Sequence, residues 1–147
     1  MIPAIIESPY GGTPEEVERN VLYARRCMLW ALQQGYAPFL SHLLYTQVLD
    51  DDIPEERTLG IEAGLAWGAG ARITVVCEDY GITKGMRQGI KAAKLAGRRV
   101  IRERIGPNAL GASSIREHEA IYALTSDIQR AEDQRALAEV VTIKKKP

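Results

Sequence analysis

The chain has 147 residues, of which 46% are apolar, and its 19 Lys and Arg residues balance its 19 Asp and Glu residues. This length predicts a single domain that buries one proper hydrophobic core. The balanced charge excludes a global field that would attract a membrane or polymeric nucleic acid, so neither is an expected partner.

The two cysteines and the N-terminus indicate the compartment. Cys27 and Cys77 fall in apolar periodic segments, which favours buried thiols in a reducing compartment over a disulfide or a metal site. The N-terminus lacks the charged start of a signal peptide, and no apolar run approaches the roughly 18 residues that span a bilayer. We therefore expect a cytoplasmic protein without a metal or another cofactor.

Strands and helices alternate along the first hundred residues. Thr13 and Glu16 form a capping box before the first predicted helix, and Gly35 ends that helix. The run 71–79 is β-branched and apolar on both faces, which predicts a central strand. The alternation in 98–105 is imperfect, which predicts an edge strand. The predicted strands are 4–7, 36–40, 71–79 and 98–105, and the predicted helices are 14–34, 54–67 and 84–96.

This order predicts an α/β fold, a Rossmann-like parallel sheet of four or five strands flanked by helices. Residues 1–106 would form the α/β domain that binds the ligand. Residues 107–147 would be a C-terminal helical appendage of the same domain, carrying an apolar stripe. We expect the stripe to pack on the domain or on a second chain, and its members are Ile115, Ile121, Leu124 and Ile128.

Ligands bind parallel sheets at the carboxyl ends of the strands, which selects the loops 8–13, 41–52 and 78–85. In the first loop, Tyr10 precedes Gly11 and Gly12. The glycines let the backbone approach a ligand, and the tyrosine could stack on a base or bind a sugar. A tight turn into a capped helix also explains the glycines.

A second candidate is the start of the helix in "DYGITKGMRQGIKAA". Thr83 and Gly85 open a helix whose free N–H groups favour an anion, and Lys84 and Arg87 add positive charge. An ordinary helix cap with solvated basic residues is the alternative. The loop is neither a Walker loop nor GxGxxG, so nucleoside triphosphates and dinucleotides are weakly supported.

Other polar residues could complete the site. His42 follows the second strand on the ligand side, and Asp50 to Asp52 could hold a sugar hydroxyl or a cation. A structural histidine and a solvated acidic loop are the alternatives. Glu62 lies among small residues, with Gly60 and Gly64 nearby, so it is either exposed or a buried functional acid.

Residues 2–102, including "SPYGGTPEEVERNVLYARRCMLWALQQGYAPFLSHL" and "YGITKGMRQGIKAAKLAGRRV", resemble the nucleoside 2-deoxyribosyltransferase-like superfamily. That superfamily includes the 2′-deoxynucleoside 5′-phosphate N-hydrolases and many phage and bacterial relatives. The resemblance implies a Rossmann-like sheet that binds a nucleoside or nucleotide. It also implies a homo-oligomer, at least a dimer, in which neighbouring chains complete the site.

Carried over by position, the resemblance assigns ligand-binding roles. Asn20 would fix the first loop from the first helix, and His42 and the following aspartates would lie along the sugar. The phosphate would be held where the third helix begins. The implied ligand-binding residues are Tyr10, Gly11, Gly12, Asn20, His42, Asp52, Thr83, Lys84, Gly85, Arg87 and Gln88.

The sequence departs from the superfamily at the carboxylate. A glutamate usually lies near the position that Gly89 occupies here, and glycosyl transfer needs a carboxylate beside the oxocarbenium centre. Glu62 or Asp51 would have to replace it. We therefore predict an N-glycosidic bond enzyme, a nucleoside or nucleotide N-hydrolase or deoxyribosyltransferase. The alternatives are a non-catalytic nucleotide-binding, sensing or sequestering protein, and an interaction module built on the C-terminal helices.

Overall fold

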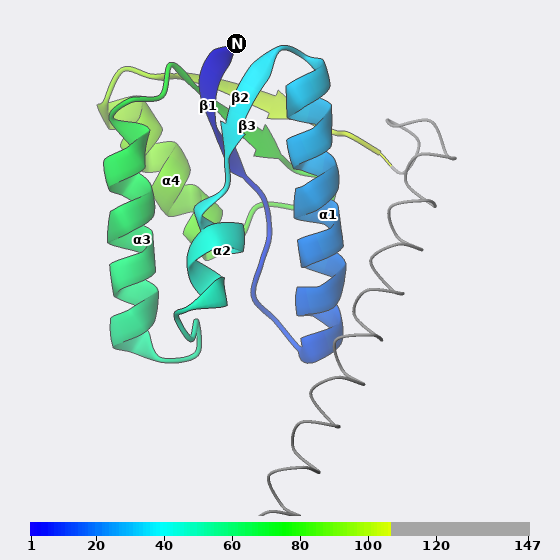
Figure 1. Ribbon diagram of the computed structural model, residues 1–147, viewed down its shortest axis with the longest axis vertical. Helices are drawn as coiled ribbons and strands as arrows, with labels where there is room; N and C mark the ends of the chain where they lie inside the picture. Colours follow the sequence, from blue (N-terminus) through cyan, green and yellow to red (C-terminus); the bar gives the residue numbers. More distant parts are fainter. Residues whose placement is uncertain (107–147) are drawn as a thin grey trace, which may run out of the picture. The chain divides into compact units, whose positions relative to one another are not determined.

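The computed structural model of the protein describes residues 1–106. The predicted C-terminal extension, residues 107–147, lies outside the described residues. Within residues 1–106, a single sheet carries helices on both faces (Figure 1). No helix in this described part is long and apolar enough to cross a membrane.

The sheet contains four parallel strands, as the α/β prediction required. Its order is β2-β1-β3-β4, so β1 and β3 are central and β2 and β4 are edges. Every residue of β3 is buried, which is typical of a strand covered on both faces. The predicted central and edge strands are therefore confirmed. The bounds are β1 Ile2–Glu7, β2 Tyr36–Phe39, β3 Ile73–Cys77 and β4 Arg99–Glu103.

The helices begin where the capping signals predicted. Thr13 accepts a hydrogen bond from the Glu16 N–H, and the Glu16 carboxylate accepts one from the Thr13 N–H at 2.8 Å, which confirms the capping box. The loop after β2 contains a short helix and a 3₁₀ turn. The bounds are α1 Pro14–Gln33, α2 Ser41–Leu44, η1 Tyr45–Gln47, α3 Pro54–Gly68 and α4 Lys84–Leu95.

Two layers of helices cover the sheet, with α1 on one face and α3 and α4 on the other (Figure 1). Val75 and Cys77 of β3 pack toward α1, whereas Val76 packs toward Met86 and Ile90 of α4. Both cysteines are buried free thiols. The buried residues of α1 are Asn20, Tyr23, Ala24, Cys27 and Ala31.

Packing against the sheet decides which apolar residues of α1 are buried. Leu32 lies near the end of the helix and is 42% exposed. Tyr23 and Cys27 define the buried face instead, because these side chains pack against β1 and β3. Tyr23 also donates a hydrogen bond of 2.5 Å to Asp79, which in turn accepts the N–H groups of Ile105 and Gly106. This network holds the chain where it leaves β4.

Alternation along β1 decides which residues meet α4. Ala4 and Ile6 belong to the core that faces α1. Successive side chains of a strand point to opposite faces, so Ile5 and Glu7 point toward α3 and α4. The last side chain of a central strand is therefore a carboxylate on the side of the sheet that α4 covers.

Candidate functional site

A cavity of about 300 Å³ lies at the carboxyl ends of the central strands. The chain leaves β1 toward β2 on one side, while β3 lies on the other, so this is the switch point of the sheet, where such folds bind ligands. The volume falls at the small end of the range for small-molecule sites. The lining comes from the loop after β1, from α2 and α3, and from the first turns of α4.

The structure brings most of the predicted site residues to this cavity. One of the two predicted catalytic residues, Asp51, lies in the wall. Seven of the predicted ligand-binding residues also line it, and they are Tyr10, Gly11, His42, Thr83, Lys84, Gly85 and Gln88. The remaining predicted residues lie outside the lining, and they are Gly12, Asn20, Asp52, Glu62 and Arg87.

Asn20 supports the first loop from behind, in the position that the resemblance implied. Its side chain is buried and donates hydrogen bonds to the carbonyls of Tyr10, at 2.8 Å, and Gly11, at 3.3 Å. Gly12 has φ +143°, and a Cβ there would collide with Glu16 of the capping box. Both residues therefore shape the loop that carries Tyr10, without lining the cavity themselves.

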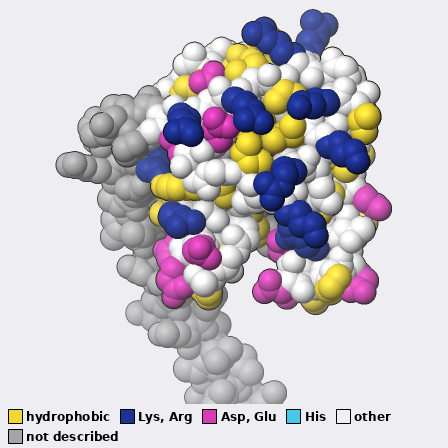
Figure 2. Space-filling view, turned by 180° about the vertical axis from the view of Figure 1, so that it is seen from behind, with side chains coloured by type: hydrophobic (Ala, Val, Ile, Leu, Met, Phe, Trp, Pro, Cys, Tyr) yellow, Lys and Arg dark blue, Asp and Glu magenta, His cyan; other side chains and the backbone are white. Residues whose placement is uncertain are grey.

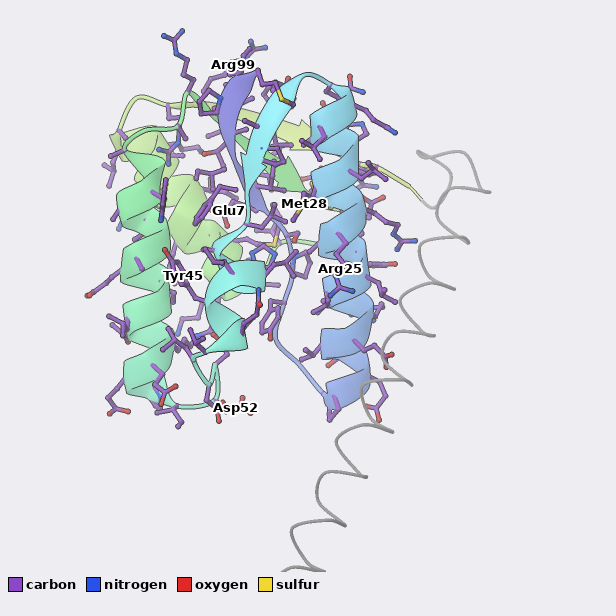
Figure 3. The ribbon with its side chains drawn as sticks, viewed as in Figure 1. Glu7, Arg25, Met28, Tyr45, Asp52 and Arg99 are labelled. Atoms are coloured by element: carbon purple, nitrogen blue, oxygen red, sulfur yellow. The ribbon has the colours of Figure 1, made fainter. Side chains whose placement is uncertain are left out.

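Two predicted residues, Glu62 and Asp52, point away from the cavity. Glu62 is exposed on α3, one residue further round the helix than Ile61, which does line the cavity. Gly64, one of the small residues near Glu62, lines the cavity and leaves room for Ser41 of α2. Asp52 is exposed at the tip of the loop before α3 (Figure 3).

Arg87 is also exposed, and it stabilises the approach to α4. Its guanidinium donates a hydrogen bond of 2.8 Å to the Ile82 carbonyl. The side chain thus braces the loop from outside, and of the two predicted basic residues only Lys84 lines the cavity.

Glu7 supplies a second carboxylate to the cavity beside Asp51, which pairs with Arg57, and the sequence analysis did not select Glu7. The side chain is mostly buried in the interior at the end of β1 (Figure 3). Within residues 1–106 it forms no hydrogen bond and no ion pair. Burial raises the pKa of Glu7 from 4.5 to about 7, although the positive charge of Arg98 lowers it in part. The protonated form of this carboxyl group is therefore much more populated near neutral pH than that of an exposed glutamate.

Gly89 of α4 makes room for this carboxylate. A Cβ built on Gly89 would lie 2.8 Å from Oε2 of Glu7 and closer still to Oε1. Any side chain at this position would displace the carboxylate. The resemblance implies a glutamate near position 89. In this fold, the carboxylate of Glu7 from β1 occupies that place.

Ser8 and His42 form a second polar pair in the wall. The Ser8 Oγ lies 2.8 Å from the His42 Nε2, and the His42 ring meets the edge of Tyr10 with 6.1 Å between ring centroids. Burial lowers the pKa of His42 to about 4, so its imidazole is neutral at physiological pH. A neutral imidazole can accept the proton of a hydroxyl group or of a water molecule.

The opposite wall is cationic. Lys84 stands at the start of α4, where the N–H groups of the first turn have no partner within the helix. Arg57 lies beside Gly85 and pairs with Asp51, and a Cβ on Gly11 would touch Asp51. The Arg57–Asp51 pair thus joins the first loop to the start of α4.

Arg98 spans the base of the cavity. Its guanidinium donates to the Gly68 carbonyl at the end of α3 and, at 2.9 Å, to the Thr74 hydroxyl. These contacts fix its positive charge near Glu7 without an ion pair between the two. Residues 78–106 contain eight Lys and Arg against three Asp and Glu, and Lys and Arg side chains spread over the face seen in Figure 2. Residues 78–106, which include α4 and contribute Lys84 and Arg98 to the cavity, therefore carry an excess of positive charge, which favours anions.

No group of three or more His, Cys, Asp or Glu residues that could hold a metal occurs within the described part of the chain. The cavity combines a buried acid, a neutral histidine and a cationic rim. Such a site can hold an anionic group at one end and stabilise positive charge or move a proton at the other.

The sequence contained a signal for Glu7. A charged residue that ends an otherwise apolar central strand stands at the point where parallel sheets bind ligands. The strand was predicted with Glu7 as its last residue, but its role required knowing which face of the sheet it meets. Ser8 follows directly and was hidden in the same way.

Fold and site together define a doubly wound α/β protein with a polar cavity at the switch point of its sheet. Residues 3–103 match a family described as a domain of unknown function, DUF7768. The match covers more than half of the chain, so the chain belongs to this family. No curated protein and no solved structure shows significant similarity to it.

Proposed function

We propose that the protein hydrolyses the N-glycosidic bond of a nucleoside monophosphate in this cavity. The observation that carries the proposal is Glu7, a mostly buried carboxylate without a partner in the described residues, facing a cavity whose other end is cationic. An unpaired buried carboxyl group costs stability and is typical of a functional site. The resemblance of residues 2–102 to nucleoside 2-deoxyribosyltransferase-like proteins supports the same reaction class.

The two ends of the cavity suit the two ends of such a substrate. Lys84 and the first turn of α4 would bind the phosphate, and Tyr10 would pack against the base or the sugar. Glu7 would lie near the anomeric carbon. A single cationic rim next to α4 fits one phosphate group better than three.

In the reaction, the bond between the anomeric carbon and the base nitrogen breaks, and its electron pair leaves with the base. The sugar ring then carries positive charge, which the ionised form of Glu7 stabilises. Water adds through its oxygen to the anomeric carbon. One proton of that water is released, and the departing base takes up one proton. The products are the free base and a sugar phosphate.

A non-catalytic nucleotide-binding role is the second candidate. The cationic rim and the neutral His42 would serve binding equally well. Glu7 disfavours this binding role, because a buried carboxyl group does not attract an anionic ligand.

The test separates the two. The full chain is incubated with ribo- and deoxyribonucleosides and their monophosphates, and free base is measured by chromatography while binding is measured by thermal shift. We expect base release from a monophosphate, reduced about 10²-fold or more by Glu7→Gln with binding retained. Binding without base release would select the sequestering role. Loss of activity in Glu62→Gln, with Glu7→Gln fully active, would overturn the assignment to Glu7.

A further inference from the structure

Glu7 and Gly89 lie against each other in the wall of the cavity and come from different elements. Glu7 ends a central strand, and Gly89 lies in the second turn of the helix that packs on it. Both line the cavity, and Gly89 is buried. The carboxylate occupies the space that a side chain at position 89 would need.

The glycine has no backbone reason to be there. Gly89 lies inside α4 and is absent from the glycines with positive φ. Glycine inside a helix is less favourable than alanine because it loses more backbone freedom on folding. Its presence in α4 is explained by the Glu7 carboxylate, which would have to move if residue 89 carried a β-carbon.

Within residues 1–106, no neighbouring charged group pairs with the Glu7 carboxylate. Arg98 approaches it but is committed to the Gly68 carbonyl and the Thr74 hydroxyl. The other charged or titratable groups that line the cavity are Tyr10, His42, Asp51, Arg57 and Lys84. Of these, Asp51 and Arg57 pair with each other and His42 contacts Ser8.

We propose that Glu7 and Gly89 together form one carboxylate subsite, which binds the positively charged sugar ring. The carboxylate of this subsite can come from position 7 of the strand or from position 89 of the helix. The strand supplies the acid in this chain, and the helix supplies the space. Moving the acid to the helix, by Glu7→Ala with Gly89→Glu, should then keep the subsite. The proposal rests on the proposed function for its substrate class.

The first experiment measures binding and requires no turnover. The probe is a pyrrolidine analogue of ribose 5-phosphate, which is protonated and cationic at neutral pH, and the reference is the tetrahydrofuran analogue, which is uncharged at that position. We expect the wild type to bind the cationic probe at least 10-fold more tightly than the reference. Glu7→Ala should remove this preference, and Glu7→Ala/Gly89→Glu should restore most of it.

A neighbouring position provides the matched control. Gln88 also lines the cavity, so Glu7→Ala/Gln88→Glu places a carboxylate one residue away on the same helix. We expect little restoration from this variant. Equal restoration from position 88, no restoration from position 89, or no preference for the cationic probe in the wild type would each overturn the inference.

Thermal unfolding checks the contact separately. Gly89→Ala should lower the melting temperature in the wild-type background, where the added methyl group meets Glu7, and should not lower it in the Glu7→Ala background. An equal loss in both backgrounds would show that the two residues do not share this space and would also overturn the inference.

Base release is the final readout, and it separates the two proposals. Glu7→Ala should lose about 10²-fold in turnover, and the exchanged variant should regain at least 10-fold. If the wild type releases no base from any nucleotide, the proposed hydrolysis fails, while the probe affinities still decide the exchange. If the wild type is active but neither affinity nor turnover returns on exchange, the exchange fails and the hydrolysis stands.

Discussion

Replacing Glu7 with glutamine should stabilise the protein at alkaline pH and leave it nearly unchanged at acid pH. Glutamine is nearly isosteric with glutamate and stays neutral. Burial raises the pKa of Glu7 from 4.5 to about 7, so the folded state holds its proton more tightly than the unfolded state. Below pH 4.5 both states are protonated, and ionisation costs the fold nothing. Between pH 4.5 and about 7 the unfolded state ionises while the folded state keeps its proton, so stability falls as the pH rises. Above about 7 both states are ionised and the cost stays constant.

The size of this effect follows from the two pKa values. Their separation corresponds to about 3 kcal/mol at ~1.4 kcal/mol per pH unit. The full cost applies above pH 7 and is nearly absent at pH 4. For a chain of this length, about 3 kcal/mol corresponds to a change in melting temperature on the order of 10 °C.

The assay is thermal or urea unfolding of the wild type and Glu7→Gln at intervals from pH 4 to pH 8.5. The matched control is Glu62→Gln, which makes the same substitution at an exposed position of α3. We expect the gap between Glu7→Gln and the wild type to open between pH 4.5 and 7, and no such gap for the control. A gap that is constant with pH, or one that closes as the pH rises, would refute the reasoning.

Three further predictions concern other parts of the site. In calorimetry, Lys84→Ala should weaken the binding of a nucleoside monophosphate about 10-fold more than the binding of the matching nucleoside. Arg87 lies outside the cavity, so Arg87→Ala should change the two affinities alike. Nuclear magnetic resonance of the His42 ring should show no titration between pH 5.5 and 8, since burial lowers its pKa to about 4; a midpoint near 6.5 would contradict the buried Ser8 contact. Asn20→Ala should cost about 1–3 kcal/mol in urea unfolding, because it leaves the carbonyls of Tyr10 and Gly11 without their donor, and an unchanged midpoint would show that the loop holds itself.

The capping and turn residues made the elements predictable. Thr13 with Glu16 and Thr83 mark the starts of α1 and α4, and Gly35 marks the end of the first helical segment with φ +82°. These signals act within a few residues, so the sequence alone contains them. The apolar run of β3 likewise identified the central strand, because burial on both faces removes the need for polar residues.

The carboxylate of the cavity illustrates the limit of such signals. Glu62 stood out in the sequence because small residues surround it, yet those residues serve the packing of α3. Ile61, Leu65 and Gly68 line the cavity, and Glu62 is about 100° round the helix from Ile61. A rotation of one residue separates a cavity residue from an exposed one, and only packing against the sheet fixes that rotation.

The sequence by itself determined the order of the elements, the parallel sheet and the loops that meet at its carboxyl edge, because period, capping and chain crossover act locally or follow general rules. Asp51 was predicted from the sequence and lines the cavity, but only the tertiary structure decided that the cavity's acid without a partner in residues 1–106 is Glu7. That choice depends on the alternation of β1 and on the distance between β1 and α4, and these bring Glu7 against Gly89, more than eighty residues further along the chain. In the sequence, Gly89 stands where the resemblance implies an acid. In the fold, the absence of a side chain at Gly89 leaves the space that the Glu7 carboxylate occupies.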